Sequence, residues 1–286
     1  MADLRRTLPG QKRNFAVLNR LSPRMALALS NGLLLLTLAC GPSDSPGAWE
    51  PGPGLKTRWA AEVDPAAPLD EYPRPQMTRS RWINLNGLWD FAVQPRQSGA
   101  PNGYSDKVLV PFPVESALSG IVRTVTPQER IWYRRTLSLP EAGPRSRWIL
   151  HFGAVDWEAE VFLNGRSLGT HRGGYDPFSF DLTGFLTEGS EQELVVAVWD
   201  PTNEGTQPRG KQVLDPRGIW YTAVSGIWQT VWLEPLPELY VSSLEVTPEL
   251  EASRVHVLVH TEGSPDPQPV QIAIYAEGNP CLLYTS

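Results

Sequence analysis

The chain has 286 residues, enough for one large β-domain or two small domains with a sizeable core. Its formal net charge of -6 and isoelectric point of about 5.3 argue against binding to a phosphate backbone, which needs a basic surface. A neutral or weakly polar ligand fits this charge balance better, and no nucleic-acid partner is expected. Eleven tryptophans are many for this length, because an indole ring can stack on a sugar but can also fill a sandwich core.

The cysteines and histidines do not indicate a disulfide or a metal site. The two cysteines, Cys40 and Cys281, do not look like a disulfide pair. None of the four histidines has a spacing typical of zinc ligands. His256 and His260 lie in the alternating run VHVLVH, so both are expected on one solvated strand face.

Residues 1–40 are predicted to be a signal peptide of the lipoprotein type. Arg24 precedes the apolar run MALALSNGLLLLTLAC, which is too short to span a bilayer and ends in small residues before a cysteine. This end resembles a bacterial lipobox, in which Cys40 is lipidated, although Thr37 stands where leucine is usual. We expect a periplasmic or cell-surface lipoprotein that meets the membrane only through its lipid anchor. An ordinary secreted protein is the alternative.

Residues 41–75 are expected to form an extended tether. They contain eight prolines together with several serines, glycines and aspartates. Such a composition favours an extended chain with no core of its own.

An all-β body is expected from Trp82 onward, because short apolar runs alternate with Gly, Pro, Asn and Asp without long helical periodicity. The first strands flank a turn at Asn86-Gly87. ELVVAVWD has apolar residues at both alternate sets of positions, so that strand is expected to be covered on both faces. Long irregular crossovers such as 201–218 favour a jelly-roll sandwich, which we place at residues 76–237. Further strands are expected in VLVPF, IWYRRTLSL, RWILHFGAV, EAEVFLNG, RSLGTHR, QELVVAVWD and IWQTVWLEP.

The stretch FLNGRSLGTHRGGYDPFSFDLT predicts a hairpin and a loop. Asn164-Gly165 fits a type I′ turn, because both residues tolerate positive φ. Asp181 is expected to cap a single helical turn. Turn chemistry is sufficient to explain His171 and Asp176, and contact with substrate is the alternative.

A second pattern starts after Pro237. The runs LEVTPELE and RVHVLVH predict two strands, and residues 238–278 are expected to be the truncated start of an immunoglobulin-like sandwich. The final NPCLLYTS fits neither strand nor turn, so residues 279–286 are expected to be a non-native tail.

Five stretches of the chain are, in order, INLNGLWDF, VPFPVESALSG, IWYRRTL, DWEAEVFLNGRSLGTHRGGYDPFSFDLT and SGIWQTVWLEP. Together they resemble the N-terminal sugar-binding domain of glycoside hydrolase family 2, a galactose-binding-like jelly roll. The likeness covers about residues 80–275 in the family's order. It implies a retaining β-glycosidase in which a jelly roll, an immunoglobulin-like domain and a catalytic TIM barrel follow one another. The chain ends before such a barrel, so we expect a fragment that is inactive alone.

No catalytic residue is predicted in this chain. A retaining glycosidase needs two carboxyl groups roughly 5–5.5 Å apart, and the resemblance implies that both are glutamates on the barrel. Asp156, Glu158 and Glu160 share one strand parity, which we interpret as an acidic solvent face. Asp176 and Asp181 sit in loop and cap contexts, where local hydrogen bonding explains them.

The resemblance implies one substrate contact at Asp200, which ends the strand before the long crossover. In galactosidase-type members an aspartate at this position reaches the terminal sugar; capping of the following turn is the alternative. Arg209, Lys211 and Gln212 lie in the polar loop that follows and are the next substrate-binding candidates, with an interdomain contact as the alternative. Asp200 alone favours a β-galactoside, followed by a β-glucuronide.

The expected partners are the carbohydrate substrate and the missing barrel, and an oligomer is left open. Galactosidase-type members use Mg and Na ions held largely by barrel residues, so no cofactor is expected in this segment. A non-catalytic carbohydrate-binding module or lectin-like surface protein is the alternative function, because the same jelly-roll form serves such proteins.

Overall fold

The computed structural model describes residues 49–140, 146–263, 266, 269–276 and 279–285. The regular structure is strand apart from three short 3₁₀ turns, so the predicted all-β class is confirmed. In these ranges no helix is long and apolar enough to cross a membrane. The predicted signal peptide and Cys40 lie outside the described residues. The turns are η1 (Arg58–Glu62), η2 (Ala117–Ser119) and η3 (Thr183–Phe185).

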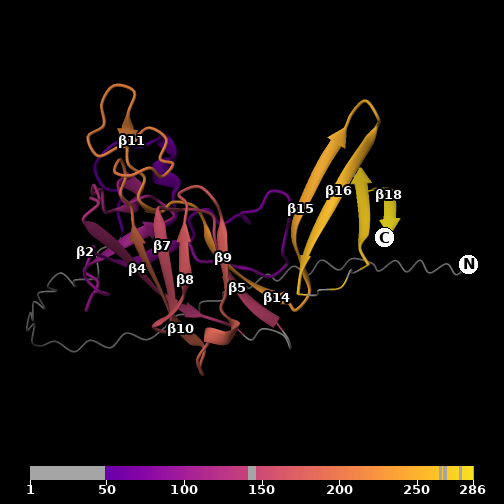
Figure 1. The fold of residues 1–286 in the computed structure, drawn as a ribbon, viewed down its shortest axis with the longest axis horizontal. Helices are drawn as coiled ribbons and strands as arrows, with labels where there is room; N and C mark the ends of the chain where they lie inside the picture. The colour runs from indigo at the N-terminus through magenta and orange to yellow at the C-terminus, as the bar shows by residue number, and fades with distance from the viewer. Residues whose placement is uncertain (1–48, 141–145, 264–265, 267–268, 277–278, 286) are drawn as a thin grey trace, which may run out of the picture. The chain divides into compact units, whose positions relative to one another are not determined.

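Two antiparallel sheets form the sandwich (Figure 1). The larger sheet has the order β3-β2-β4-β10-β7-β8, and the smaller one β1-β14-β5-β9. Neighbours in space are distant in sequence, as expected for a jelly roll. The larger sheet consists of β2 (Gly87–Pro95), β3 (Asp106–Val110), β4 (Glu129–Ser138), β7 (Glu158–Leu163), β8 (Arg166–Arg172) and β10 (Glu191–Trp199). The smaller consists of β1 (Ile83–Asn84), β5 (Ser146–Phe152), β9 (Phe178–Asp181) and β14 (Val231–Pro237).

Strand β10 is covered on both faces, which confirms the expectation from ELVVAVWD. Val196 and Val198 are fully buried in the core between the sheets. Ala197, one position away, is also fully buried, in a second cluster with Trp132 and Ala92. Since side chains alternate between the faces of a strand, this second cluster lies on the outer face of the larger sheet.

The hairpin between β7 and β8 has the predicted turn. Asn164 and Gly165 have φ of 51° and 74°, the pair of positive values that a type I′ turn requires. Gly169 on the return strand has φ of 142°, and a Cβ there would lie 3.0 Å from the ring of Phe180. Both glycines are therefore needed by the local backbone.

The segment before the sandwich is not the free tether expected for residues 41–75. The Tyr72 hydroxyl donates to Glu234 Oε1 on β14 over 2.6 Å. The Asn86 side chain donates to the carbonyl of Pro68 over 3.1 Å. The prolines exclude regular strand, but they leave carbonyls and side chains free to bond to the sandwich. The described part of this segment therefore belongs to the folded domain.

Four strands follow the sandwich. β15 (Tyr240–Glu249) and β16 (Arg254–Glu262) form an antiparallel hairpin, as LEVTPELE and RVHVLVH predicted, with His256 exposed on β16. β17 (Gln271–Ala276) pairs with β18 (Asn279–Thr285). The expectation that the final residues form no strand is therefore wrong: CLLYT is rich in residues that accept an extended backbone.

Candidate functional site

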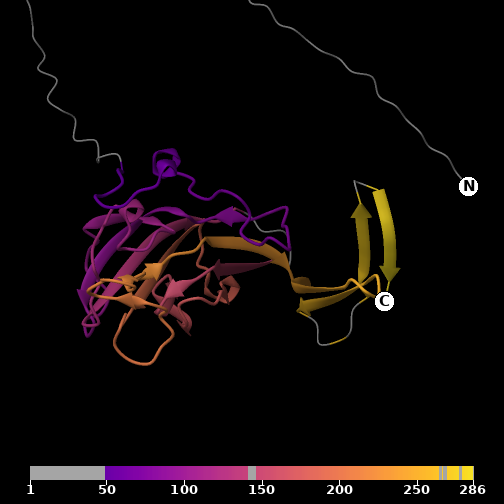
Figure 2. The same cartoon turned by 90° about the horizontal axis from the view of Figure 1, so that it is seen from above.

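One end of the sandwich is closed by a long segment that we call the crossover loop, residues 201–225. It joins β10 to the short strand β13 (Gly226–Ile227), which pairs with β6 (Val155–Asp156). The loop itself contains β11 (Gln212–Val213) and β12 (Tyr221–Thr222), a parallel pair. In Figure 1 the loop around β11 projects beyond the strands, and Figure 2 shows the same orange loop from a second side.

The two ends of the crossover loop are tied together by Asp200. This residue follows β10 and is only 3% exposed. Its Oδ1 accepts from the Thr202 amide over 2.6 Å, and its Oδ2 accepts from the Ser225 hydroxyl over 2.6 Å. The amide of Ser225 donates to Glu115 Oε2 over 2.9 Å, so a second carboxyl group holds the same end of the loop.

The middle of the loop is fastened to a third carboxyl group, that of Asp156 on β6. Gln212 donates from Nε2 to Asp156 Oδ2 over 3.2 Å and accepts at Oε1 from the Val224 amide over 2.6 Å. A Cβ at Gly174 would lie 2.6 Å from Asp156 Oδ1, so a glycine is required beside this carboxyl group.

The three carboxyl groups share an environment that favours their protonated forms. Burial raises the pKa of Glu115 to about 7. Burial, followed by the neighbouring Asp200, raises the pKa of Asp156 to about 7. Burial also raises the pKa of Asp200, against the opposing hydrogen bonds from Ser225 and Thr202. None of the ion pairs found among the described residues includes these groups, so no cation partner opposes the effect of burial on their pKa values.

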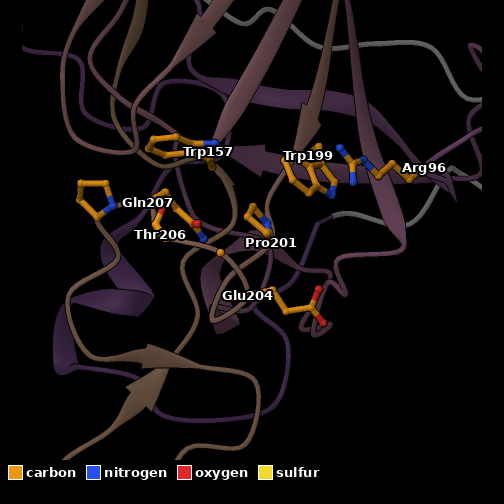
Figure 3. A pocket seen from close by; sticks show the side chains of 9 residues that line it. Arg96, Trp157, Trp199, Pro201, Glu204, Thr206 and Gln207 are labelled. Carbon is orange, nitrogen blue, oxygen red and sulfur yellow. The ribbon is translucent and has the colours of Figure 1, made fainter.

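A pocket of about 650 Å³ lies beside this cluster, with indole rings on one side and the start of the crossover loop on the other (Figure 3). The Arg96 guanidinium lies 3.5 Å from the ring centroid of Trp199, whose Nε1 donates to the Pro127 carbonyl over 2.8 Å. An aromatic face with a few polar groups at its rim is suited to a sugar ring. The pocket is lined by Arg96, Trp157, Trp199, Pro201, Glu204, Gly205, Thr206, Gln207 and Pro208.

Comparison with known proteins places this geometry in a family. Residues 104–237 match the sugar binding domain of glycosyl hydrolases family 2. This part of the chain belongs to family 2. The match spans β3 to β14 and contains the three buried carboxyl groups and the crossover loop.

The curated relatives of this family 2 domain are glycosidases. A β-glucuronidase of Paenibacillus borealis is 28% identical over 144 residues, which are 48% of this chain and 24% of that protein. A β-galactosidase of Bacteroides ovatus is 34% identical over 169 residues, 55% of this chain and 18% of that protein. The chain therefore spans less than a quarter of the length of these two relatives.

Solved structures show the same fold. A β-glucuronidase of Faecalibacterium prausnitzii has a TM-score of 0.56 at 24% identity, covering 74% of this chain and 40% of that one. A β-glucuronidase of Ruminococcus gnavus in complex with D-glucuronic acid has a TM-score of 0.57 at 21% identity, covering 76% of this chain and 40% of that one.

The structure brings two of the four predicted substrate-binding residues of the family 2 domain into one network. Asp200 and Gln212 are both buried and joined through the cluster described above. Arg209 and Lys211 lie on the same loop but do not line the pocket of Figure 3. Lys211 is exposed and its amide donates to the Tyr221 hydroxyl over 3.1 Å.

The expectation of a shared acidic solvent face is wrong for Asp156. This residue lies on β6 and is buried, whereas Glu158 and Glu160 lie on β7 and pair with Arg130 over 3.6 Å each. The chain passes from one sheet to another between these strands, so simple alternation does not carry across. Glu115 was not predicted at all, because it sits in an irregular segment without periodicity.

The residues around the loop between β8 and β9 make local contacts within the protein. The ring of His171 stacks on that of Phe178 with centroids 4.1 Å apart. Asp181 pairs with Arg147 over 2.7 Å and accepts from the Thr183 amide over 2.9 Å. The N-cap of η3 is Leu182 and not Asp181 as predicted, so this bond is a local Asx-type contact one residue before the cap. Across the described ranges, no group of three or more His, Cys, Asp or Glu is arranged to hold a metal ion.

Proposed function

We propose that this chain is the N-terminal portion of an exported family 2 glycoside hydrolase that cleaves terminal β-glycosidic bonds during carbohydrate breakdown. The match of residues 104–237 to the family's sugar binding domain carries this proposal. Its curated relatives include β-glucuronidases and β-galactosidases, of which the chain spans only a small share.

The catalytic pair is assigned in this proposal to two glutamates on a TIM barrel that follows this region. A retaining mechanism needs a carboxylate that attacks the anomeric carbon and a carboxyl group that protonates the leaving oxygen. The carboxyl oxygens of Asp200 and Asp156 are instead engaged by Thr202, Ser225 and Gln212. These bonds favour a role in holding the crossover loop, so the chain alone is proposed to be inactive.

In this proposal the domain itself forms one side of the substrate-binding pocket. Trp157 and the stacked pair of Arg96 and Trp199 line one side of the pocket, and the crossover loop, held by Asp200, lines the opposite side. We favour a β-galactoside as substrate because of the position of Asp200, with a β-glucuronide as the second candidate, supported by the relatives. Any Mg or Na ion is assigned to barrel residues.

Export as a lipoprotein rests on the leader that ends at Cys40. Labelling of expressing cells with a radioactive fatty acid tests it: label should enter the protein and be lost in Cys40→Ser. Label in neither protein, with both recovered in the medium, would indicate ordinary secretion instead.

The activity itself is tested on the full-length gene product. We expect turnover of nitrophenyl β-galactoside or β-glucuronide by the full-length enzyme, and none by residues 1–286 alone. Nitrophenyl α-galactoside serves as the control substrate. Turnover by the short chain, or a downstream reading frame without a barrel, would overturn the proposal.

A further inference from the structure

The described part of the chain contains the dipeptide Asn-Gly at three places: at the start of β2, in the loop between β2 and β3, and in the turn between β7 and β8. This dipeptide is chemically reactive, because the glycine amide nitrogen can attack the preceding side chain and glycine has no Cβ to hinder the approach. In a folded protein the reaction requires an asparagine side chain that is free to turn toward that nitrogen. The three pairs are Asn86-Gly87, Asn102-Gly103 and Asn164-Gly165.

The first pair is held in place by the sandwich. Asn86 is only 2% exposed. Its Nδ2 donates to the Pro68 carbonyl over 3.1 Å and to Thr230 Oγ1 over 3.3 Å. Its Oδ1 accepts from the Val231 amide over 3.0 Å. The side chain cannot turn toward Gly87 without breaking three hydrogen bonds, so this pair is protected.

The third pair is held as well, although Gly165 is exposed. Asn164 donates from Nδ2 to Gln192 Oε1 over 2.7 Å and to the Phe185 carbonyl over 3.2 Å. Its Oδ1 accepts from the Glu193 amide over 2.9 Å. Exposure of the turn therefore does not free its asparagine side chain.

The second pair has no such restraint. Asn102 and Gly103 are both exposed. Among the described residues, neither the Asn102 side chain nor the Gly103 amide has a hydrogen-bond partner. A Cβ at Gly103 would meet nothing within 4 Å, so the space around the glycine is open. The Asn102 side chain is thus free to turn toward the next amide nitrogen.

We propose that Asn102 is a site of spontaneous deamidation. The Gly103 nitrogen loses its proton and forms a bond to Cγ of Asn102, while the bond from Cγ to Nδ2 breaks and ammonia leaves. The product is a five-membered succinimide ring. Water then adds to one of its two carbonyl groups and opens the ring, which gives aspartate or isoaspartate at position 102. The sequence of steps uses only water and needs no enzyme, oxidant or cofactor.

The reaction would change the outer face of the larger sheet. A new carboxylate makes the net charge one unit more negative than the formal -6 of the chain. Isoaspartate also lengthens the main chain by one carbon between residues 98–101 and Tyr104, which line a cavity of about 460 Å³. The Tyr104 ring lies 4.3 Å from the Arg134 guanidinium carbon. Charge and loop length would therefore change together, and the change would accumulate with the age of each molecule. No step depends on the hydrolase activity proposed above.

The test is prolonged incubation of the purified chain at mildly alkaline pH, where the attacking nitrogen loses its proton more readily, followed by trypsin digestion and mass spectrometry. Trypsin places the three asparagines on separate peptides, residues 82–96, 97–107 and 148–166. The peptide 97–107 should gain about one mass unit as its amide becomes an acid. This gain should be at least about tenfold faster than in the other two peptides. Methylation by an isoaspartate methyltransferase should identify the isoaspartate product.

Gly103→Ala is the matched variant, because the added Cβ hinders the attack and meets no neighbour in the fold. It should slow the reaction at Asn102 at least about tenfold, with an unchanged circular dichroism spectrum. In urea all three peptides should react at similar rates, because the bonds that hold Asn86 and Asn164 are then lost. An Asn102 that stays intact in the folded chain but reacts in urea would overturn the proposal. Equal rates for all three asparagines in the folded chain, or a wild-type rate in Gly103→Ala, would overturn it too.

Discussion

Gln212 donates a hydrogen bond to Asp156 across 3.2 Å and so fastens the middle of the crossover loop to β6. The same amide group accepts from the Val224 amide, close to the far end of the loop. One side chain therefore links β6 and two parts of a 25-residue connection that contains little regular structure.

Gln212→Ala should loosen the crossover loop without unfolding the sandwich. Loss of the side chain leaves the buried Asp156 carboxyl and the Val224 amide without partners, at a cost of about 1–3 kcal/mol in the free energy of unfolding. Hydrogen exchange should show faster exchange of the Val224 amide. Lys211→Ala, the exposed neighbour, serves as control, and equal protection in both variants would contradict the prediction.

The buried carboxyl cluster should make stability fall as pH rises. The pKa values of Glu115 and Asp156 are raised from 4.5 and 3.8 to about 7 in the folded chain. Their stabilising contribution is fully present below the unfolded pKa values and is lost as pH rises through about 7. Urea unfolding between pH 4 and pH 8 should show a loss on the order of 3 kcal/mol. Asp156→Asn should flatten this slope, and an unchanged slope in that variant would count against the cluster.

The buried Glu234 should instead make the free energy of unfolding fall as the pH is lowered. Burial alone would raise its pKa, but nearby His151 and the Tyr72 hydroxyl lower it to about 2. The stabilising contribution is present above 4.5 and is lost as pH falls toward about 2. Glu234→Gln should cost roughly 3 kcal/mol at pH 6, measured by urea unfolding. Glu245→Gln, an exposed glutamate on β15, should cost almost nothing.

Gly226→Ala should disrupt the junction between the crossover loop and the sandwich. Gly226 has φ of 87°, and a Cβ there would collide with the buried Tyr133 hydroxyl. We expect a loss of about 2 kcal/mol or more, seen as a lower melting temperature. Gly184→Ala is the control, since nothing lies within 4 Å of a Cβ at that position. Equal melting temperatures for the two variants would refute the steric argument.

Asp200→Asn should affect the kinetics of the full-length enzyme. The change keeps the shape of the side chain but replaces one acceptor oxygen with a donor, which conflicts with the Ser225 hydroxyl or the Thr202 amide. Displacement of the loop should raise KM or lower kcat, measured with nitrophenyl β-glycosides. Unchanged constants in a folded variant would limit Asp200 to a turn cap.

Much of the sandwich follows from local patterns in the sequence. The apolar residues at both odd and even positions of β10 predicted a strand covered on both faces. Asn164-Gly165 predicted the turn geometry of the β7–β8 hairpin. These features depend on neighbouring residues, whose alternation and φ preferences can be read directly.

The carboxyl cluster could not be predicted in the same way. Glu115, Asp156 and Asp200 are separated in the sequence by 41 and then 44 residues, and they meet only because three separate segments converge at β13. The alternation of side chains along a strand wrongly assigned Asp156 to the solvent face, because the chain passes to another sheet directly after this residue. The second buried cluster around Trp132 likewise depends on the register that sets Ala92 and Ala197 beside it.

The pairing of β14 has a consequence for how the chain is made. This strand lies between β1 and β5, with Leu233 paired with Ile83, so the smaller sheet has no centre until residues near 237 have been synthesised. Pairing over such a sequence separation is slow, because a long loop must close before its contacts form. The smaller sheet therefore closes last, after every strand of the larger sheet has been synthesised, so the inner face of the larger sheet has no complete cover until that point.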